Sequence, residues 1–374
     1  MKTLVTGGAG FIGSHLVARL LERGDDVVVL DSLESQVHEG LVRNGRPTSL
    51  PEGAEFIHGD VGDPELVERA LENVGKVVHL AAAVGVGQSM YEIERYVRTN
   101  TLATASFLER LVAHTPLVSR LVVASSMSIY GEGEYECAEH GTIAPTPRPE
   151  EQLLARQWEC FCPECGRELQ PVATRETKPL IPTSIYAITK RDHEELCLVT
   201  GAAYGIPTVA LRFFNVYGPG QALSNPYTGV AAIFASRLLN GRAPVIFEDG
   251  RQSRDFIHVS DIVEGILLAL ESEDAVGSAI NVGTGRVTTV DDVGHALAAG
   301  LGVHAEPERT SRYRAGDIRH CYADITRAEK LLGFRASVRL EEGMAALIEW
   351  LAGQEADDRV DTATGELMAR GLAR

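Results

Sequence analysis

The feature that most constrains the fold is a glycine-rich turn near the N-terminus, TGGAGFIG over residues 6–13, which directly follows a short apolar run. In such a turn the first glycine permits a tight bend, the second lets the backbone approach a bound pyrophosphate, and the third lets a helix lie close to a strand. Gly7, Gly10 and Gly13 have the spacing that these three roles require. The sequence therefore predicts a strand, this turn and a helix in direct succession.

The same alternation of strand and helix patterns continues through the first half of the chain. Short apolar runs, TLVTG, DVVVLD, EFIHGD, KVVHLAA and RLVVASS, are separated by segments with helical patterns. Parallel strands that are buried on both faces have continuous apolar sequences of this kind. The predicted fold class is α/β, a Rossmann-type, doubly wound parallel sheet with helices on both faces.

The length of 374 residues favours two lobes. We expect a dinucleotide-binding domain over residues 1–212, interrupted at 132–181 by an insertion rich in Pro, Glu, Arg and Cys. Residues 213–352 are expected to form a smaller α/β lobe that binds the substrate over the carboxyl edge of the sheet. Residues 353–374 are polar without strong periodicity, so we expect a mobile tail.

Two aspartates follow strands of the predicted sheet and are candidates for the adenosine half of a dinucleotide. Asp31 ends the second strand, where a carboxylate accepts hydrogen bonds from a ribose and repels a 2′-phosphate, so NAD is favoured over NADP. Asp60, in HGDV, is a candidate partner of the adenine amino group. The alternative for Asp60 is an ordinary turn or helix-capping residue.

The charge balance argues against some classes of partner. The chain has 35 basic and 52 acidic residues, a formal net charge of -17, which repels nucleic acids and anionic membrane surfaces. The sequence has no signal-peptide pattern and no apolar stretch near the roughly 20 residues of a membrane helix. We therefore expect a cytoplasmic protein with no nucleic-acid or membrane partner.

A second set of polar residues has the pattern of a catalytic site. Tyr186 and Lys190 lie four residues apart on a predicted helix and so share one face, and Ser125 and Ser126 end a central strand. A phenol that acts as a base near neutral pH must lower its pKa by roughly three units from its reference value near 10. Positive charge from Lys190 and an oxidised nicotinamide, with a serine to align the reacting oxygen, would favour this.

An ordered series of further motifs supports a family assignment. These motifs are HLAA, RTN, SSMSIYG, YAITK, RFFNVYGP, RDFIHVSDI and RAGDIRHCYAD. With them the sequence resembles the extended short-chain dehydrogenase/reductase family, in particular its NAD-dependent nucleotide-sugar epimerases and dehydratases. The resemblance implies that Ser126, Tyr186 and Lys190 are catalytic.

The resemblance also implies a cofactor site and a substrate site. Besides the glycines and aspartates above, Tyr186 and Lys190, the implied cofactor-site residues are Phe11, Ile12, Val61, Leu80, Ala81, Ala82, Asn100, as a structural support, and Ser125. The implied substrate-site residues are Ser126, Ser128, Asn215, Arg254 and Arg314, near the pyrophosphate, and Asp317, near the nucleoside. Guanidinium groups suit this task because they bind phosphate oxygens in a bidentate manner.

The residues that follow Ser126 narrow the expected reaction. The related dehydratases and decarboxylases carry a carboxylate where this chain has Met127 and Ser128. We therefore expect redox chemistry at one carbon, namely 4-epimerisation of a nucleotide-linked hexose through a transient 4-keto sugar. The alternatives are a 4-ketoreductase or alcohol dehydrogenase, a UDP-glucose or UDP-glucuronate 4-epimerase and, outside enzymes, an NAD-binding scaffold.

The insertion has two paired-ligand motifs typical of zinc sites. Cys137-Ala-Glu-His140 and Cys162-Pro-Glu-Cys165 would supply three thiolates and one imidazole, a closed tetrahedral shell for a structural ion in a zinc-ribbon-like insertion. Cys160 is the rival of His140 as fourth ligand, and unliganded thiols are the remaining alternative.

Two more expectations come from the resemblance. The insertion, together with the segment QALSNPYTGVAAIFASRLL, is similar to the group of dTDP-L-rhamnose 4-epimerases, which interconvert that sugar with dTDP-6-deoxy-L-talose. The helices that carry Asn100 and Tyr186 resemble those that pair as a four-helix bundle in dimers of the family, which implies a homodimer.

Overall fold

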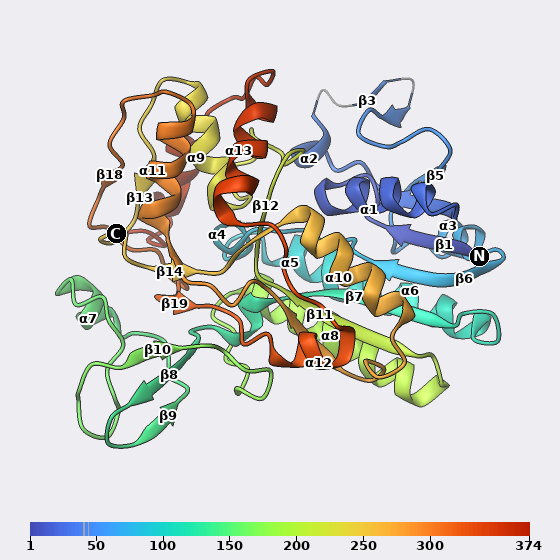
Figure 1. Cartoon of the computed structure of the whole chain (residues 1–374), viewed down its shortest axis with the longest axis horizontal. Helices are drawn as coiled ribbons and strands as arrows, with labels where there is room; N and C mark the ends of the chain where they lie inside the picture. Colours follow the sequence, from blue (N-terminus) through green and yellow to red (C-terminus); the bar gives the residue numbers. More distant parts are fainter. Residues whose placement is uncertain (40–41, 44) are drawn as a thin grey trace.

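The protein is described by a computed structural model that covers residues 1–39, 42–43 and 45–374. A seven-stranded sheet forms its centre (Figure 1), with the strand order β16-β11-β7-β6-β1-β2-β5 and parallel pairing throughout. The strands are β1 (Lys2–Thr6), β2 (Asp26–Asp31), β5 (Glu55–His58), β6 (Val74–His79), β7 (Arg120–Ser126), β11 (Thr208–Phe213) and β16 (Ala279–Val282). The predicted doubly wound fold is confirmed.

Helices cover both faces of this sheet because successive strand residues point to opposite sides. On β1, Val5 packs into one core cluster and Leu4 into the other. The first cluster receives side chains of α1 (Phe11–Glu22), α10 (Val259–Glu271) and α12 (Thr326–Leu332). The second receives side chains of α3 (Pro64–Ala70), α6 (Ala103–Leu111) and α8 (Ile185–Tyr204).

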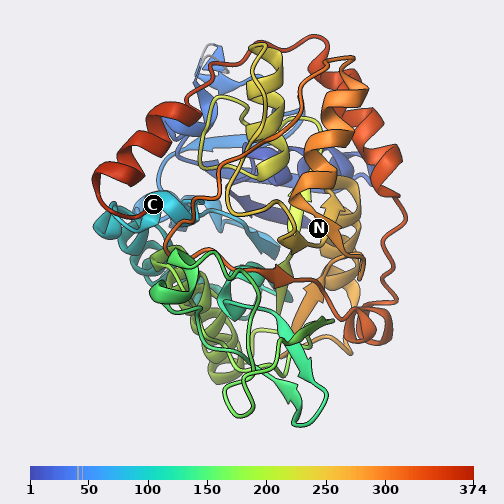
Figure 2. The same ribbon diagram turned by 90° about the vertical axis from the view of Figure 1, so that its left-hand side faces the viewer.

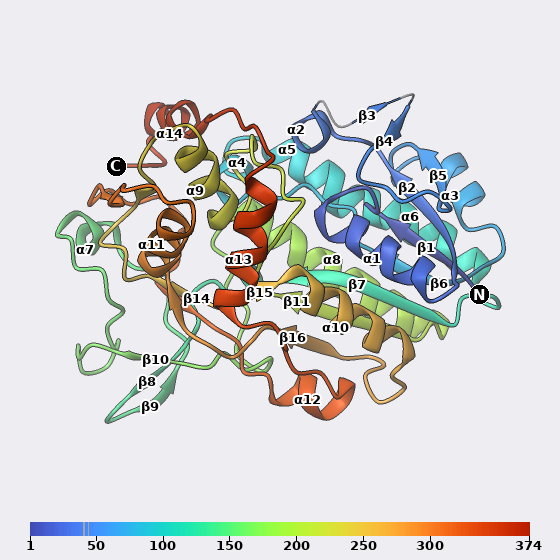
Figure 3. The same cartoon turned by 45° about the horizontal axis from the view of Figure 1, so that its top comes forward.

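A smaller lobe lies beyond the carboxyl ends of the strands (Figure 3). Its core, which includes Phe234, Leu297 and Leu347, joins α9 (Val230–Leu239), α11 (Val290–Gly300) and α13 (Leu340–Leu351). Its short strands are β12 (Asn215–Tyr217), β13 (Val245–Ile246), β14 (Ser253–Arg254), β15 (Phe256–His258), β17 (Thr288–Thr289), β18 (Glu308–Arg309) and β19 (His320–Cys321).

The boundary expected at residue 213 does not divide the chain cleanly into two lobes. β16 pairs with β11, and α10 and α12 pack on the large sheet, so parts of residues 213–352 belong to the dinucleotide-binding lobe. The chain returns to the sheet after building part of the smaller lobe. A return of this kind depends on pairing between distant strands, which no local pattern reveals.

The insertion projects from the body of the protein (Figure 1). It contains a three-stranded antiparallel sheet, ordered β10-β8-β9, and one short helix. The elements are β8 (Glu134–Cys137), β9 (Gly141–Ile143), α7 (Glu150–Leu154) and β10 (Gln170–Val172). Helix α8 begins directly after the insertion, with the Ser184 side chain accepting a hydrogen bond from the Ala187 N–H as its N-cap.

The expectation of a mobile C-terminal tail is wrong. Val360–Ala369 form helix α14, which folds back over the body of the protein (Figure 2). Ala363 and Leu367 are buried, and the backbone of Arg374 pairs with that of Tyr313 through two hydrogen bonds. A few apolar residues at helical spacing order the segment although its composition is polar.

Short elements complete the chain. They are α2 (Ser35–His38), β3 (Val42–Arg43), β4 (Arg46–Pro47), α4 (Val86–Ser89), α5 (Ile93–Tyr96), a π-helical turn at Val97–Leu102 and 3₁₀ turns at Val112–His114 and Met127–Tyr130. None of the helices in the described part of the chain has the length and apolar character needed to span a bilayer.

Candidate active site

A cavity of about 640 Å³ lies between the two lobes. It reaches the carboxyl end of the sheet where β1 lies between β2 and β6, the point from which the strand order runs in both directions. Open α/β sheets bind their ligands at this switch point. The sheet topology thus places the cavity where a dinucleotide is expected.

The glycine-rich turn forms one wall of this cavity and fits a diphosphate. Gly7 has a φ of +68°, and a Cβ atom there would lie 2.7 Å from the Ala81 nitrogen, so only glycine is accommodated. Gly10 is the N-cap of α1 and has no side chain to cap the helix, so the first helical turn is open toward the cavity. A helix N-terminus without a side-chain cap is well suited to bind an anion.

The two candidate aspartates also line the cavity. The carboxylate of Asp31 accepts hydrogen bonds from the N–H groups of Ala9 (3.0 Å) and Leu33 (2.9 Å), which fixes it at the end of β2. Asp60 accepts a hydrogen bond of 2.6 Å from the Gly62 N–H and so stabilises the turn after β5. It also lines the cavity.

One residue expected at the cofactor lies behind the cavity instead. The residues that do line it are Gly7, Gly10, Phe11, Ile12, Gly13, Asp31, Asp60, Val61, Leu80, Ala81, Ala82, Ser125, Tyr186 and Lys190. Asn100 is buried, and its side-chain amide bonds to both backbone groups of Ala83 and to the Thr189 hydroxyl. It therefore joins the π-helical turn to α8 and to the loop after β6, and acts as a support without facing the cavity.

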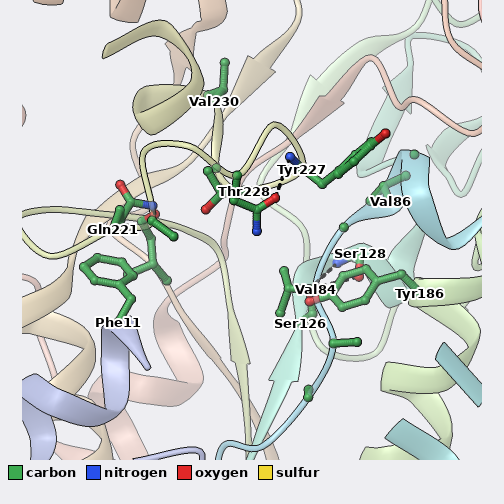
Figure 4. A pocket seen from close by; sticks show the side chains of 18 of the residues that line it. Phe11, Val84, Val86, Ser126, Ser128, Tyr186, Gln221, Tyr227, Thr228 and Val230 are labelled. Carbon is green, nitrogen blue, oxygen red and sulfur yellow. Dashed lines mark hydrogen bonds between the residues drawn. The ribbon is translucent and has the colours of Figure 1, made fainter. Parts of the chain in front are cut away.

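The proposed catalytic hydroxyl groups meet at the end of β7 (Figure 4). Ser126 ends this strand, and its Oγ accepts hydrogen bonds from the Ser128 hydroxyl (2.9 Å) and the Ser128 N–H (3.2 Å). Because both bonds are donated to Ser126, the hydroxyl proton of Ser126 is free to bond another oxygen. Tyr186 on α8 lies beside Ser126, and its backbone N–H donates to the Ser89 hydroxyl at 3.0 Å.

Burial raises the pKa of Tyr186 above its usual value, and a hydrogen bond with Ser126 only partly opposes this. Burial also lowers the pKa of Lys190 to about 7. The ammonium of Lys190 contacts Nδ1 of His193 at 3.0 Å. That Lys190 favours the phenolate stays a prediction, and the oxidised ring of a bound cofactor would be a second source of positive charge.

The residues expected to bind the nucleotide lie in the smaller lobe's wall of the cavity. Arg254 donates hydrogen bonds to the carbonyl groups of Ser253, Ile318 and Arg319, which fix its guanidinium group. Arg314 bonds to Asp317 at 2.8 Å and stacks over the ring of Phe247. Both cations are therefore held in place before a ligand binds.

Unpaired amide oxygens in the same wall indicate a polar ligand. Oδ1 of Asn215, Oε1 of Gln221 and Oε1 of Gln252 are buried and have no hydrogen-bond partner among the described residues, and all three residues line the cavity. A buried polar atom without a partner is costly, so these atoms suit hydroxyl or N–H groups of a substrate. Asn215 was expected here from the sequence, but the two glutamines were not.

Charged groups of the insertion support this nucleotide wall. Arg319 is fully buried and pairs with Glu159 of the insertion and with Glu248 and Asp249 of the smaller lobe. Arg148 of the insertion donates to the Asp317 carbonyl at 3.2 Å. A buried ionic network of this kind fixes geometry strongly because removing one partner leaves an unpaired charge.

The four candidate metal ligands converge. One ligand atom each from Cys137, His140, Cys162 and Cys165 lies within 4.8 Å of all the others. His140 Nδ1 is 3.5 Å from the sulfurs of Cys137 and Cys162, and Cys137 Sγ is 3.6 Å from Cys165 Sγ. Around a tetrahedral zinc ion, sulfurs are about 3.8 Å apart, and a sulfur and a nitrogen about 3.6 Å.

The rival ligand lies elsewhere. Cys160 is buried beside Tyr135 and is not part of this group, and burial raises the pKa of its thiol to about 12. The geometry favours His140, whose Nε2 lies 3.5 Å from the Glu164 carboxylate. Metal-bound histidines commonly have such a carboxylate on the second nitrogen.

Sequence reasoning missed two parts of the cavity wall. One is formed by Val84, by Val86 at the start of α4 and by Tyr227 (Figure 4), and the other is helix α14. A usable signal existed for α14, because its cavity-lining residues Val360, Ala363, Thr364 and Leu367 follow helical spacing. Their spacing was hidden by polar neighbours.

Comparison with known proteins agrees with this geometry. Residues 3–152 and 160–283 match the NAD dependent epimerase/dehydratase family. The chain is 35% identical to dTDP-L-rhamnose 4-epimerase of Burkholderia thailandensis, over 95% of this chain and 96% of the relative.

Solved structures give the same result. The UDP-glucose 4-epimerase of Thermotoga maritima with UDP-glucose is 32% identical with a TM-score of 0.76, over 94% of this chain and 99% of that one. The UDP-glucose 4-epimerase of Thermus thermophilus with NAD is 32% identical with a TM-score of 0.73, over 94% and 99%.

This protein belongs to the NAD-dependent epimerase/dehydratase family, as its motifs predict. It is an enzyme of the extended short-chain dehydrogenase type, and NAD is its cofactor.

Proposed function

We propose that this enzyme inverts carbon 4 of a nucleotide-linked hexose, and that its substrates are dTDP-L-rhamnose and dTDP-6-deoxy-L-talose. The observation that carries the reaction is that Ser126 and Tyr186 line the same cavity as the glycine-rich turn before α1 and the two arginines of the smaller lobe. The dTDP-L-rhamnose 4-epimerase of Burkholderia thailandensis, similar over nearly its whole length, supports the choice of sugar.

The polar groups beside Ser126 favour epimerisation over loss of water or carbon dioxide. The carboxylates that line the cavity, those of Asp31, Glu34, Asp60, Glu248 and Asp317, belong to the β2 and β5 ends or to the smaller lobe. Met127 and Ser128, which follow Ser126, are uncharged. In the described part of the chain, the site thus has hydroxyl groups for proton transfer beside Ser126 but no carboxylate there as a second acid or base.

Tyr186 and Ser126 have different roles in the proposed reaction. Bound NAD supplies a reversible hydride acceptor. Tyr186 takes the proton of the sugar's 4-hydroxyl group, while Ser126 donates a hydrogen bond to the same oxygen and is oriented by Ser128. When the keto sugar has turned over, Tyr186 returns the proton to an oxygen on the other side of carbon 4.

Turnover of the sugar requires that the nucleotide stay bound while the hexose rotates. Arg254 and Arg314 are fixed by contacts inside the protein, so they can hold a pyrophosphate without moving. The sugar end of the cavity contains apolar and hydroxyl groups, which bind either face of the ring without strict directionality.

A panel of nucleotide sugars tests this proposal. Purified enzyme with NAD should convert dTDP-L-rhamnose to its 4-epimer faster than it converts UDP-glucose or UDP-glucuronate, with no net absorbance of reduced nicotinamide. Stoichiometric NADH formation would show a dehydrogenase, and a preference for a UDP-sugar would overturn the choice of substrate while leaving the reaction intact.

We further propose that Cys137, His140, Cys162 and Cys165 hold a structural zinc ion. The separations of their ligand atoms fit a tetrahedral ion, and four protein ligands leave no open position for catalysis. The free energy of structural zinc binding, roughly 10 to 16 kcal/mol, is sufficient to order a small insertion.

We also propose that the enzyme is a homodimer. Ile188 and Val199 lie eleven residues apart on one face of α8, and Val97 and Leu102 lie on the neighbouring π-helical turn, all exposed. A hydrogen bond of 2.9 Å from Thr101 to Asp192 joins the two helices. Exposed apolar residues on adjacent helices favour pairing with a second copy.

A further inference from the structure

Helix α14 is held across the cavity by contacts to both lobes. On the dinucleotide side, Tyr91 donates a hydrogen bond to Glu366 at 2.9 Å, and Arg370 stacks over the Tyr91 ring. On the other side, Tyr227 donates to the same carboxylate at 3.2 Å, and Arg237 pairs with Asp361 at 2.7 Å. The helix is therefore a fixed part of the cavity wall.

The face of α14 toward the cavity is almost entirely apolar. Its lining residues are Val360, Ala363, Thr364 and Leu367, at positions i, i+3, i+4 and i+7. Ala363 is 7% exposed and Leu367 is 4% exposed. The acidic residues of the helix have other partners, because Asp361 pairs with Arg237 and Glu366 accepts hydrogen bonds from two tyrosines.

This apolar face lies at the catalytic end of the cavity. A Cβ atom on Gly87 would be 3.5 Å from Leu367, so α14 packs on α4, whose Ser89 hydroxyl accepts a hydrogen bond of 3.0 Å from the Tyr186 N–H. Val84 and Val86 line the same cavity as Ser126 and Tyr186 (Figure 4). Leu367 thus approaches the cavity from the side where the sugar reacts.

The chemistry of a hexose indicates which group meets this wall. Tyr186 must reach the oxygen on carbon 4, and carbon 6 is attached to carbon 5, the immediate neighbour of carbon 4. The nucleotide, on carbon 1, extends the other way, toward Arg254 and Arg314. The carbon 6 group therefore lies at the reacting end of the cavity, and in one of the two orientations of the turning sugar it can face α14.

We propose that α14 determines which sugar is accepted, with Ala363 and Leu367 forming an apolar surface that favours a methyl group on carbon 5 and disfavours a carboxylate. This inference rests on the proposed function for the orientation of the sugar. A methyl group buries apolar surface against Leu367, whereas the carboxylate of a hexuronate loses its water without a cation on α14 to replace it.

Exchange of Leu367 for serine tests the inference. Dissociation constants of the NAD-loaded enzyme should be measured by calorimetry for dTDP-L-rhamnose, UDP-glucose and UDP-glucuronate, together with kcat/KM. In Leu367→Ser, affinity for the 6-deoxy sugar relative to the hexuronate should fall about tenfold, since one apolar contact discriminates by roughly this factor. Met368→Ser, at the exposed next position, should leave the ratio unchanged within about twofold.

A second variant should shift the affinity ratio in the opposite direction. A misfolded protein would not give opposite shifts in the two variants. Ala363→Val adds two methyl groups to the cavity-facing side of α14 and leaves less room for the group on carbon 5. It should therefore weaken hexose and hexuronate binding more than binding of the 6-deoxy sugar. Equal loss for all three sugars in either variant, or an unchanged ratio in Leu367→Ser, would overturn the inference. Because binding is measured directly, a protein without epimerase activity still yields the ratio, and failure of the proposed function is seen separately.

Discussion

At the scale of single residues, the phenol of Tyr186 has the central role in the proposed reaction and an unfavourable starting state. Burial raises its pKa, and Lys190 contacts His193 at 3.0 Å. The phenol is thus protonated until positive charge arrives beside it, and the oxidised form of NAD carries that charge. Tyr186 can therefore take a proton from the sugar only when oxidised NAD, the hydride acceptor, is bound beside it.

The first prediction concerns this hydroxyl group. Tyr186→Phe should lower turnover by roughly 10² to 10⁴, the usual contribution of a general acid–base group, while NAD remains bound. Tyr204→Phe makes the same change at an exposed position of the same helix and should leave turnover intact. Turnover by Tyr186→Phe within tenfold of the unchanged enzyme would remove Tyr186 from its proposed role.

The second prediction concerns Lys190 and pH. Burial lowers its pKa to about 7 from 10.5, so between these values the unfolded chain binds a proton that the folded chain does not. Stability should therefore rise with pH across this window, by up to about 1.4 kcal/mol per pH unit from this group. In Lys190→Met, stripped of nucleotide, this rise should be absent from urea unfolding measured at pH 7, 8 and 9. An equal slope in both proteins would show that the amine stays charged in the folded state.

At the scale of elements, the insertion has a role beyond its own stability. Arg148 and Glu159 tie it to the chain segment that carries Asp317 and Arg319. Disorder in the insertion should therefore reach the nucleotide wall but not the glycine-rich turn, which belongs to the opposite lobe.

The third prediction follows from this connection. Enzyme purified without chelator should contain about one equivalent of zinc, and Cys162→Ser should lose it and raise the KM for the nucleotide sugar, with NAD affinity unchanged. Cys160→Ser, a matched change nearby, should keep the metal. Less than half an equivalent in the unchanged enzyme, or equal loss in both variants, would contradict the site.

Features set by local spacing could be predicted from the sequence, and features set by contacts between distant segments could not. The turn at Gly7 and the pair Tyr186 and Lys190 were predictable because their spacing is local and has a direct geometric meaning. His140 was also predicted as the fourth ligand, but the exclusion of its rival Cys160 depends on how the insertion sheet folds. The return of β16 to the large sheet and the packing of α14 depend on contacts between distant segments.

At the scale of the whole molecule, the two lobes enclose one cavity, and three separate parts of the chain close it. The large sheet, the smaller lobe and helix α14 each provide part of its wall. The pairing of two copies through α8 would further fix Tyr186 in place.

The fourth prediction tests this pairing. Sedimentation velocity should show a dimer, and Val199→Glu should convert it to monomer because a charge is costly in an apolar interface. Val287→Glu changes an exposed valine of the smaller lobe and should leave the dimer intact. A monomeric unchanged enzyme at micromolar concentration would contradict the proposal.

The central claim is that one hydrogen leaves carbon 4 and returns to the same carbon from the opposite side, without contact with water. Nucleotide sugar carrying deuterium at carbon 4 tests it in a single measurement by mass spectrometry of the epimerised product in ordinary water. The product should retain its deuterium on carbon 4. Loss of the deuterium to solvent would contradict transient oxidation by the bound cofactor and require a different chemistry at this site.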